Sequence, residues 1–196
     1  MHDQKRSRMA ARWLFARNFI RHPYMLGSLI PSSRFLVNQV LDPIDWERAR
    51  VIVEYGPGVG TFTGEIVRRM NPEARLVAIE MNSDFVRFLQ TSILDSRLHV
   101  ELGSAADVMQ VLRRLGLPAA DYIISGIPLG SMPESLRADI VQKSQAALGP
   151  RGEFLVYQFT SRVLPVLRRT FRQVRRRIEL RNVPPAQLFL CADKVT

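Results

Sequence analysis

Apolar runs of strand length alternate with helical patterns along most of the chain. Val51–Tyr55 and Arg75–Glu80 are short and rich in β-branched side chains, and residues 61–70 between them carry apolar side chains at helical spacing. A strand, a helix and a second strand in this order predict a parallel βαβ unit.

The same alternation continues toward the carboxyl terminus. It predicts helices at 83–93, 105–115, 133–148 and 164–170, and strands at 98–102, 121–125, 152–159, 171–183 and 187–192. The last two strands are separated by Pro184-Pro185 without a long helical pattern, so we expect an antiparallel hairpin at the sheet edge. The whole pattern predicts an α/β, Rossmann-like fold with a mostly parallel seven-stranded sheet.

Residues 1–42 depart from this pattern and predict an amphipathic helical extension. Its apolar positions at helical spacing are Met9, Trp13, Ala16, Phe19 and Ile20, and its basic positions are Arg8, Arg12, Arg17 and Arg21. A helix that lies in a membrane surface, with its apolar face in the acyl boundary, has this composition. The alternative is a helix that packs on the main domain and leaves its charged face in water.

Composition narrows the classes of protein. The 196 residues are 46% hydrophobic and 23% charged, and none of the apolar runs approaches the roughly 20 residues that a membrane-spanning helix needs. The single cysteine, Cys191, excludes an internal disulfide, and with three histidines we expect no metal centre. We expect a cytoplasmic protein without a secretory signal.

The charge predicts an anionic partner. There are 28 basic and 18 acidic residues, which gives a formal net charge of +10. Nucleic acid and an anionic membrane surface both attract such a protein through their phosphates, and the charge does not separate them. The alternative is that the arginine excess reflects codon usage.

A glycine-rich loop lies between the first strand and the helix after it. Its sequence is Glu54-Tyr-Gly56-Pro-Gly58-Val-Gly60-Thr61, and glycines at such a place let the backbone turn sharply and approach a ligand. A dinucleotide fingerprint needs a third glycine where Thr61 stands, so the spacing favours S-adenosylmethionine over NAD. The alternative is a turn that only joins a strand to a helix.

This loop resembles the first motif of class I methyltransferases. The resemblance implies that Gly56, Gly58, Gly60 and Thr61 surround the cofactor, that Glu54 holds its methionine end, and that Glu80 binds its ribose hydroxyls. It also implies that Met81, Ser104, Ala105 and Ser125 complete the cofactor site, with Met81 on the adenine. A capping or salt-bridge role for Glu54 and a core position for Met81 are the alternatives.

The loop after the fourth parallel strand argues against a nucleic-acid base as acceptor. Adenine dimethyltransferases of ribosomal RNA carry Asn-Leu-Pro-Tyr or Asn-Leu-Pro-Phe there, which supplies an acceptor for the amine and a ring for stacking. This chain has Gly126-Ile-Pro-Leu129 instead, so neither group is present. We therefore expect no nucleic-acid partner.

The chain as a whole resembles the small bacterial phospholipid N-methyltransferases, which are related to the rRNA adenine dimethylases. The resemblance rests on Gly27–Arg34, Val53–Gly60, Ser125–Leu129 and Tyr157–Thr160, and residues 31–33 (Pro-Ser-Ser) discriminate best. It implies methyl transfer from S-adenosylmethionine to phosphatidylethanolamine and its mono- and dimethyl forms, giving phosphatidylcholine and S-adenosylhomocysteine. Ornithine-lipid methylation, rRNA adenine N6-methylation and lipid binding without catalysis are the alternatives.

This resemblance sets expectations for organisation and catalysis. Residues 1–42 would form membrane-binding or lid helices, and residues 43–196 the methyltransferase domain at the inner face of the cytoplasmic membrane. Tyr24 and Tyr157 are the candidates for orienting the amine, with their rings available for cation–π contact. Backbone carbonyls around Ser125 and Ile127 are candidates for accepting its hydrogen bond. A packing role is the alternative for both tyrosines.

A second basic cluster lies in the predicted strand at 171–183. Alternation places Val174, Ile178 and Leu180 on one face and Arg175, Arg177 and Arg181 on the other. An outer arginine face of this kind is suited to phosphate head groups. The alternative is a charged edge strand that prevents aggregation.

Overall fold

The computed structural model describes residues 34–182 and 184–193. The helix expected within residues 1–33, Tyr24 and the Pro-Ser-Ser segment lie outside the described residues. No helix in the described ranges is both long and apolar enough to span a membrane.

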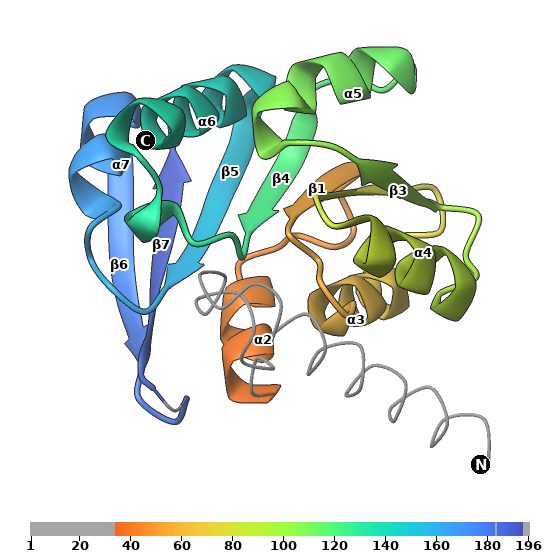
Figure 1. The fold of residues 1–196 in the computed structure, drawn as a ribbon, viewed down its shortest axis with the longest axis horizontal. Coiled ribbons are helices and arrows are strands. Elements are labelled where there is room, and N and C mark those ends of the chain that lie inside the picture. The colour runs from red at the N-terminus through yellow and green to blue at the C-terminus, as the bar shows by residue number, and fades with distance from the viewer. Residues whose placement is uncertain (1–33, 183, 194–196) are drawn as a thin grey trace.

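The described residues form one seven-stranded sheet with the order β3-β2-β1-β4-β5-β7-β6 (Figure 1). The strands are β1 (Val51–Tyr55), β2 (Arg75–Glu80), β3 (Leu98–Leu102), β4 (Ala120–Ser125), β5 (Leu148–Gln158), β6 (Gln173–Glu179) and β7 (Ala186–Ala192). β7 runs antiparallel to β5 and β6, and the other pairs are parallel. The expected α/β, Rossmann-like fold with its antiparallel hairpin is confirmed.

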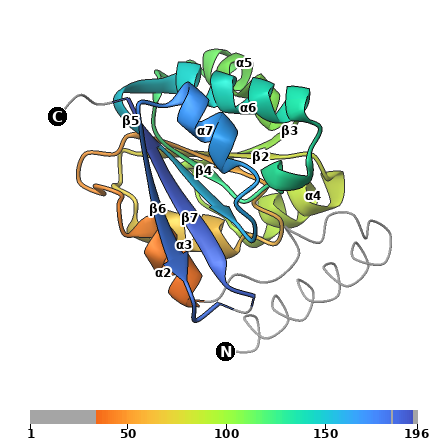
Figure 2. The same cartoon turned by 90° about the vertical axis from the view of Figure 1, so that its left-hand side faces the viewer.

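Helices cover both faces of the sheet (Figure 2). They are α2 (Arg34–Leu41), α3 (Thr61–Arg69), α4 (Ser83–Ser92), α5 (Val108–Arg114), α6 (Glu134–Ala147) and α7 (Leu164–Thr170), with 3-10 turns η2 (Ala105–Asp107) and η3 (Leu129–Ser131). α5, α6 and α7 lie on one face, and α2, α3 and α4 lie on the other. The sheet therefore has an apolar core on each side.

This double covering explains the apolar run of β1. All five residues of the strand are buried, because alternate side chains enter opposite cores. Val51, Val53 and Tyr55 pack with the α5–α6–α7 side, while Ile52 packs with the α2–α3 side. Glu54 is the one charged residue in this buried strand. Its burial therefore requires a functional or structural explanation.

α2 belongs to the covered core rather than to a detached extension. Leu36, Val37, Val40 and Leu41 are buried, and they pack in the same cluster as Ile52 and other residues of the sheet. The helix lies within the 1–42 segment that the sequence sets apart, so at least this part of the segment is built onto the sheet.

The second half of β6 carries exposed side chains on both of its faces. Arg175 and Arg177 on the arginine face are exposed as expected, although the Arg177 guanidinium lies 3.8 Å from the carboxylate of Asp42 and Glu179 on the same face is buried. On the other face, Ile178 is 49% exposed and Leu180 is 73% exposed. Only Val174 on their face packs into the core, because α7 ends at Thr170 and covers the beginning of the strand.

Candidate cofactor and acceptor site

The site predicted by the sequence lies at the carboxyl ends of the parallel strands. The order of strands reverses between β1 and β4, and open α/β sheets bind ligands at that point. Gly56 N donates to the carbonyl of Ile79 at 2.9 Å, and Gly126 N donates to the carbonyl of Tyr55 at 3.1 Å. These bonds fix the starts of the two loops beside neighbouring strand ends.

The glycine loop needs its first glycine for two independent reasons. Gly56 has φ +68°, in the left-handed region that side chains other than glycine rarely adopt. A Cβ atom at this position would also lie 2.6 Å from Cγ2 of Ile127. The loop after β1 and the loop after β4 therefore pack directly against each other.

Glu54 is a buried carboxylate beneath this loop. The Thr63 hydroxyl donates to its Oε2 at 2.7 Å. Burial raises the pKa of Glu54 to about 8, and the nearby charge of Glu80 adds to the rise. A cation bound at this place would restore the ionised form, so the environment favours a positively charged ligand.

Glu80, at the end of β2, ties two loops together. It is buried, and it accepts hydrogen bonds from Gly58 N at 3.1 Å and from Asn82 N at 2.9 Å. Burial raises the pKa of this carboxyl group as well. Besides the ligand role that the sequence predicts, Glu80 thus holds the glycine loop against the start of α4.

The residues predicted for the adenine side gather beyond β2 and β3. Gly103 N donates to the carbonyl of Glu80 at 2.9 Å, which places the segment after β3 beside that carboxylate. Met81 is 71% exposed, which excludes the alternative of a core position. Ser104 caps η2 by accepting from Ala106 N at 3.2 Å, and Ala105 is buried. Thr61 is exposed at the start of α3.

On the acceptor side, the ring of Tyr157 lies over Gly126. A Cβ atom at position 126 would lie 2.3 Å from the tyrosine hydroxyl oxygen and 2.8 Å from Cζ. The ring itself is stacked on Phe62, with centroids 4.9 Å apart and planes at 19°. The absence of a side chain at Gly126 thus allows the Tyr157 hydroxyl to occupy the space where a residue such as asparagine would project.

The structure argues against Ile127 as a backbone acceptor. Its carbonyl already accepts from Leu129 N at 2.8 Å and from Nε2 of Gln158 at 2.7 Å, so both lone pairs are in use. We assign Ile127 a packing role against Gly56. Ser125 differs, because its buried hydroxyl oxygen has no hydrogen-bond partner within the described ranges.

Gln158 is a site residue that the sequence analysis missed. Its amide binds the loop after β4 at two points, since Oε1 also accepts from Gly130 N at 3.1 Å. The only sequence signal is its place beside Tyr157 in the Tyr-Gln-Phe-Thr segment. A small cavity of about 100 Å³ adjoins it, lined by Pro128, Gly130, Ser131, Gln158, Phe159, Thr160 and Arg162.

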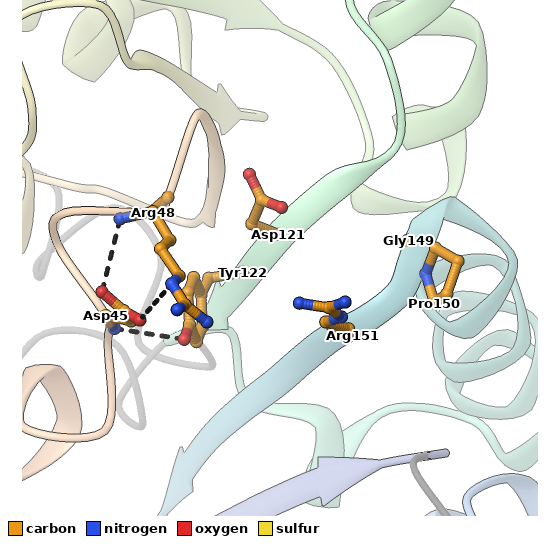
Figure 3. Close-up of a pocket in the computed structure, with 8 residues that line it drawn as sticks. Asp45, Arg48, Asp121, Tyr122, Gly149, Pro150 and Arg151 are labelled. Atoms are coloured by element: carbon orange, nitrogen blue, oxygen red, sulfur yellow. Dashed lines mark hydrogen bonds and ion pairs between the residues drawn. The ribbon is translucent and has the colours of Figure 1, made fainter.

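A larger pocket lies at the opposite edge of the sheet, where β1, β4 and β5 begin (Figure 3). It measures about 540 Å³, and its acidic residues are engaged in holding the backbone. Asp121 accepts from Arg50 N at 2.7 Å and Val51 N at 3.0 Å, and the Asp45 carboxylate accepts from Arg48 N at 3.3 Å. We attribute a structural role to these groups.

The residues at the carboxyl edge fit S-adenosylmethionine. The cofactor carries cationic groups, ribose hydroxyls and an adenine, and the site offers Glu54, Glu80 and a backbone cradle free of side chains at Gly56. The hydroxyl of Ser125, which has no partner among the residues that the structure describes, adds a buried polar atom that can receive a ligand group. The fold and this site define a class I methyltransferase.

Comparison with known proteins places the chain in a family. The ribosomal RNA adenine dimethylase family model matches residues 24–112. An ornithine lipid N-methyltransferase of Singulisphaera acidiphila is 34% identical over 187 residues, which cover 91% of this chain and 94% of that protein. The chain belongs to the family of S-adenosylmethionine-dependent methyltransferases that includes this protein.

More distant proteins share part of the chain or the fold alone. Ribosomal RNA small subunit methyltransferase A of Mycoplasma capricolum is 31% identical over 124 residues, which cover 61% of this chain and 40% of that protein. The crystal structure of human methyltransferase-like protein 13 in complex with SAH superimposes with a TM-score of 0.60 at 18% identity, covering 88% of this chain and 81% of that chain.

Proposed function

We propose that this protein transfers methyl groups from S-adenosylmethionine to the primary amine of a membrane lipid. The observation that carries the proposal is the acceptor loop, in which Gly126 leaves room for the Tyr157 hydroxyl. The S. acidiphila relative supports a lipid acceptor, because the similarity extends over almost the whole of both chains.

Two lipids are the candidate acceptors. The sequence motifs favour phosphatidylethanolamine, which would be converted through its mono- and dimethyl forms to phosphatidylcholine. The relative is named for ornithine lipid. Both lipids present an aliphatic amine near an anionic head group or a membrane surface. The same alignment of the amine with the methyl group of the cofactor therefore suits either lipid.

The mechanism requires alignment and removal of water more than covalent chemistry. When bound, S-adenosylmethionine supplies an electrophilic methyl group. Glu54 and Glu80 hold the cofactor from below the glycine loop, and the Tyr157 hydroxyl orients the amine above Gly126. The ammonium group of the lipid must lose a proton before it attacks, and a water molecule suffices as the base. Tyr24 remains a predicted second partner of the amine.

Tyr157 also suits the methylated product. A quaternary or partly methylated ammonium is attracted to an aromatic face by about 0.5 to 2 kcal/mol. Phe62, stacked on the far side of Tyr157, holds the ring in place for this contact. The second tyrosine or the cavity beside Gln158 and Arg162 would then receive the rest of the head group.

Methylation of rRNA adenine is the second candidate, supported by the family-model match. That match ends at residue 112, so it includes Glu54 and Glu80 but stops before the acceptor loop. Leu129, which stands where those enzymes carry an aromatic ring, is fully buried and offers no stacking platform. The part of the chain that would bind an adenine therefore lacks the groups that adenine chemistry needs.

An anionic membrane surface is the proposed partner, with the protein bound peripherally at the inner face of the cytoplasmic membrane. The net charge of +10 supports this placement. The predicted helix between Arg8 and His22 would supply one contact.

The test is transfer of labelled methyl groups to three separate acceptors: vesicles with phosphatidylethanolamine, vesicles with ornithine lipid, and rRNA. The proposal expects label in one or both lipids, with products resolved by chromatography. Label in rRNA alone would overturn it in favour of the second candidate. Cofactor binding without label in any acceptor would also count against it.

A further inference from the structure

Two large apolar side chains lie exposed at the tip of the β6–β7 hairpin. Ile178 precedes the last residue of β6, and Leu180 is the first residue beyond that strand. The hairpin extends past the end of α7 in both views of the molecule (Figures 1 and 2). An exposed isoleucine and leucine this close together form a surface that is poorly matched to water.

Cationic side chains lie immediately beside this apolar pair. Arg175, Arg176 and Arg177 precede Ile178 in β6, and all three are exposed. Arg176 shares the face of Ile178, because side chains alternate along a strand. Apolar residues flanked by arginines match the boundary between head groups and acyl chains, where each surface cation adds attraction to anionic lipid.

The described residues at the tip are joined by several hydrogen bonds. The buried Glu179 carboxylate accepts from Arg181 N at 2.8 Å, Nε at 3.0 Å and Nη2 at 2.9 Å. Asn182 Nδ2 donates to the carbonyl of Pro184 at 2.8 Å, and the Arg181 guanidinium stacks 4.5 Å from the ring centroid of Phe35. These contacts hold the described residues of the tip, so less conformational entropy of their side chains remains to be lost on binding.

The tip lies at the same edge of the sheet as the cofactor site. β1, β4 and β5 are parallel to one another, and β7 runs antiparallel to both β5 and β6. β6 therefore runs in the same direction as β1. The carboxyl end of β6 therefore points the same way as the strand ends that carry Glu54, Glu80 and Ser125. A membrane in contact with the tip would face the acceptor side of the site.

We propose that the hairpin tip, formed by Arg175, Arg176, Arg177, Ile178 and Leu180, inserts into the head-group region of an anionic membrane beside the acceptor site. This inference rests on the proposed function, because a lipid acceptor reaches the site from a membrane. The tip binds the membrane in addition to the predicted N-terminal helix. It thereby sets the orientation of the sheet relative to the bilayer.

The test is flotation of the full chain with vesicles of phosphatidylcholine and phosphatidylglycerol, beside vesicles of phosphatidylcholine alone. The variant is Ile178→Ser with Leu180→Ser, which removes apolar surface without adding charge. Because Ile178 is already half-buried and both side chains would bury only part of their exposed surface among the head groups, we expect about tenfold weaker binding to the anionic vesicles. The matched control is Leu94→Ser, at a residue that is 87% exposed before β3 at the opposite edge.

Four readouts decide the outcome. Weaker vesicle binding with unchanged thermal unfolding and unchanged binding of S-adenosylhomocysteine supports the proposal. Equal binding by the variant and the wild type overturns it. Lower thermal stability of the variant would indicate that another segment of the same chain covers the two apolar side chains. A change in oligomeric state would indicate that a second copy of the chain covers them. Either result overturns the proposal.

A separate assay distinguishes this proposal from the proposed function. Wild type and variant are compared for methyl transfer to the lipid dispersed in detergent micelles. Equal rates there, with a loss on vesicles, place the defect in membrane contact. No transfer by the wild type in micelles removes the lipid-methylation proposal, while the flotation result still decides the role of the tip.

Discussion

At the scale of single residues, Glu54 is a buried carboxyl group for which we propose a role in binding the cofactor. Its carboxyl group is buried, with the Thr63 hydroxyl as its hydrogen-bond donor, and its pKa is raised to about 8. Near neutral pH the free protein therefore holds this group largely protonated. A cationic cofactor reverses the preference, because the ionised carboxylate then has a charge partner.

Replacing Glu54 with glutamine separates the effect of this carboxyl group on stability from its proposed effect on cofactor binding. A raised pKa in the folded state means that the contribution to stability is present below about pH 4.5 and is lost as pH rises through about 8. We expect Glu54→Gln to match the wild type near pH 5 and to exceed it by on the order of 3 kcal/mol near pH 9. Urea unfolding at both pH values measures this. A variant that is less stable than the wild type at the higher pH would contradict the assignment.

The same carboxyl group predicts proton release when the cofactor binds. Binding of S-adenosylmethionine lowers the pKa of Glu54 in the complex, so affinity rises with pH up to about 8 and then levels off. Calorimetry near pH 7 in two buffers of different ionisation enthalpy gives the number of protons released. The Glu54→Gln variant is the control, and it should release fewer protons. Identical proton release by both proteins would contradict this role.

Gly126 predicts a change in catalysis rather than in cofactor binding. An alanine there would bring Cβ to 2.3 Å from the Tyr157 hydroxyl oxygen, so the ring must move. We expect Gly126→Ala to lower the rate of methyl transfer roughly tenfold to a hundredfold, because alignment of the amine is lost. The control is Gly64→Ala, since nothing lies within 4 Å of a Cβ at that helical position. Full activity of Gly126→Ala would show that Tyr157 does not orient the acceptor.

At the scale of elements, Arg97 joins the end of α3 to the start of β3. Its guanidinium donates to the carbonyls of Val67 at 3.1 Å and Met70 at 3.2 Å, and its Nη2 donates to Asp95 at 2.7 Å. The same ion pair lowers the pKa of Asp95 to about 2. One side chain thus satisfies carbonyls at a helix end that would otherwise have no intrahelical partner.

Removing this connection should destabilise the fold. We expect Arg97→Ala to lower the free energy of unfolding by about 1 to 3 kcal/mol, and Arg97→Lys to recover only part of it, because a lysine lacks the planar fork. Arg113→Ala, at an exposed position in α5, is the control and should change little. Denaturant unfolding compares the three variants, and equal stability of Arg97→Ala and Arg113→Ala would contradict this role.

Most elements could be predicted from the sequence, because their burial follows simple periodicity. The first four strands were predicted within one residue. β1, β2 and β4 are buried and nearly continuous apolar runs, whereas the partly exposed β3 alternates apolar with polar residues. β5 begins at Leu148 rather than at 152, because Gly149-Pro150 stops the helix and already belongs to an irregular start of the strand. The exposed arginine face of β6 follows from alternation along the strand, but the exposure of Ile178 and Leu180 could not be predicted, because it depends on α7 covering only the beginning of the other face.

At the scale of the whole molecule, the net charge of +10 predicts a salt-dependent membrane interaction. Exposed charges interact over about 8 Å at physiological ionic strength, and added salt shortens that range. We expect binding to anionic vesicles to fall steeply as sodium chloride is raised, whereas binding of S-adenosylmethionine changes little because its site is partly buried. Flotation and calorimetry over the same salt series check this. Salt-independent binding to vesicles would contradict an electrostatic contribution.

The candidate site could be predicted in part. The glycine loop, Glu54 and Glu80 carry their signal in spacing along the chain, so the sequence finds them. Gln158 and the contact between Gly126 and Tyr157 depend on how two loops meet, and no local pattern specifies that. The exposure of Met81 and the occupied carbonyl of Ile127 likewise follow from tertiary packing.

The most direct test of lipid-amine methylation is a competition in one reaction. The purified full chain receives labelled S-adenosylmethionine together with rRNA and anionic vesicles that contain phosphatidylethanolamine and ornithine lipid. We predict label in the lipid fraction, and a Glu80→Ala variant that needs more cofactor to reach the same rate while it still binds the vesicles. Label that accumulates in rRNA and not in lipid would contradict the proposed function.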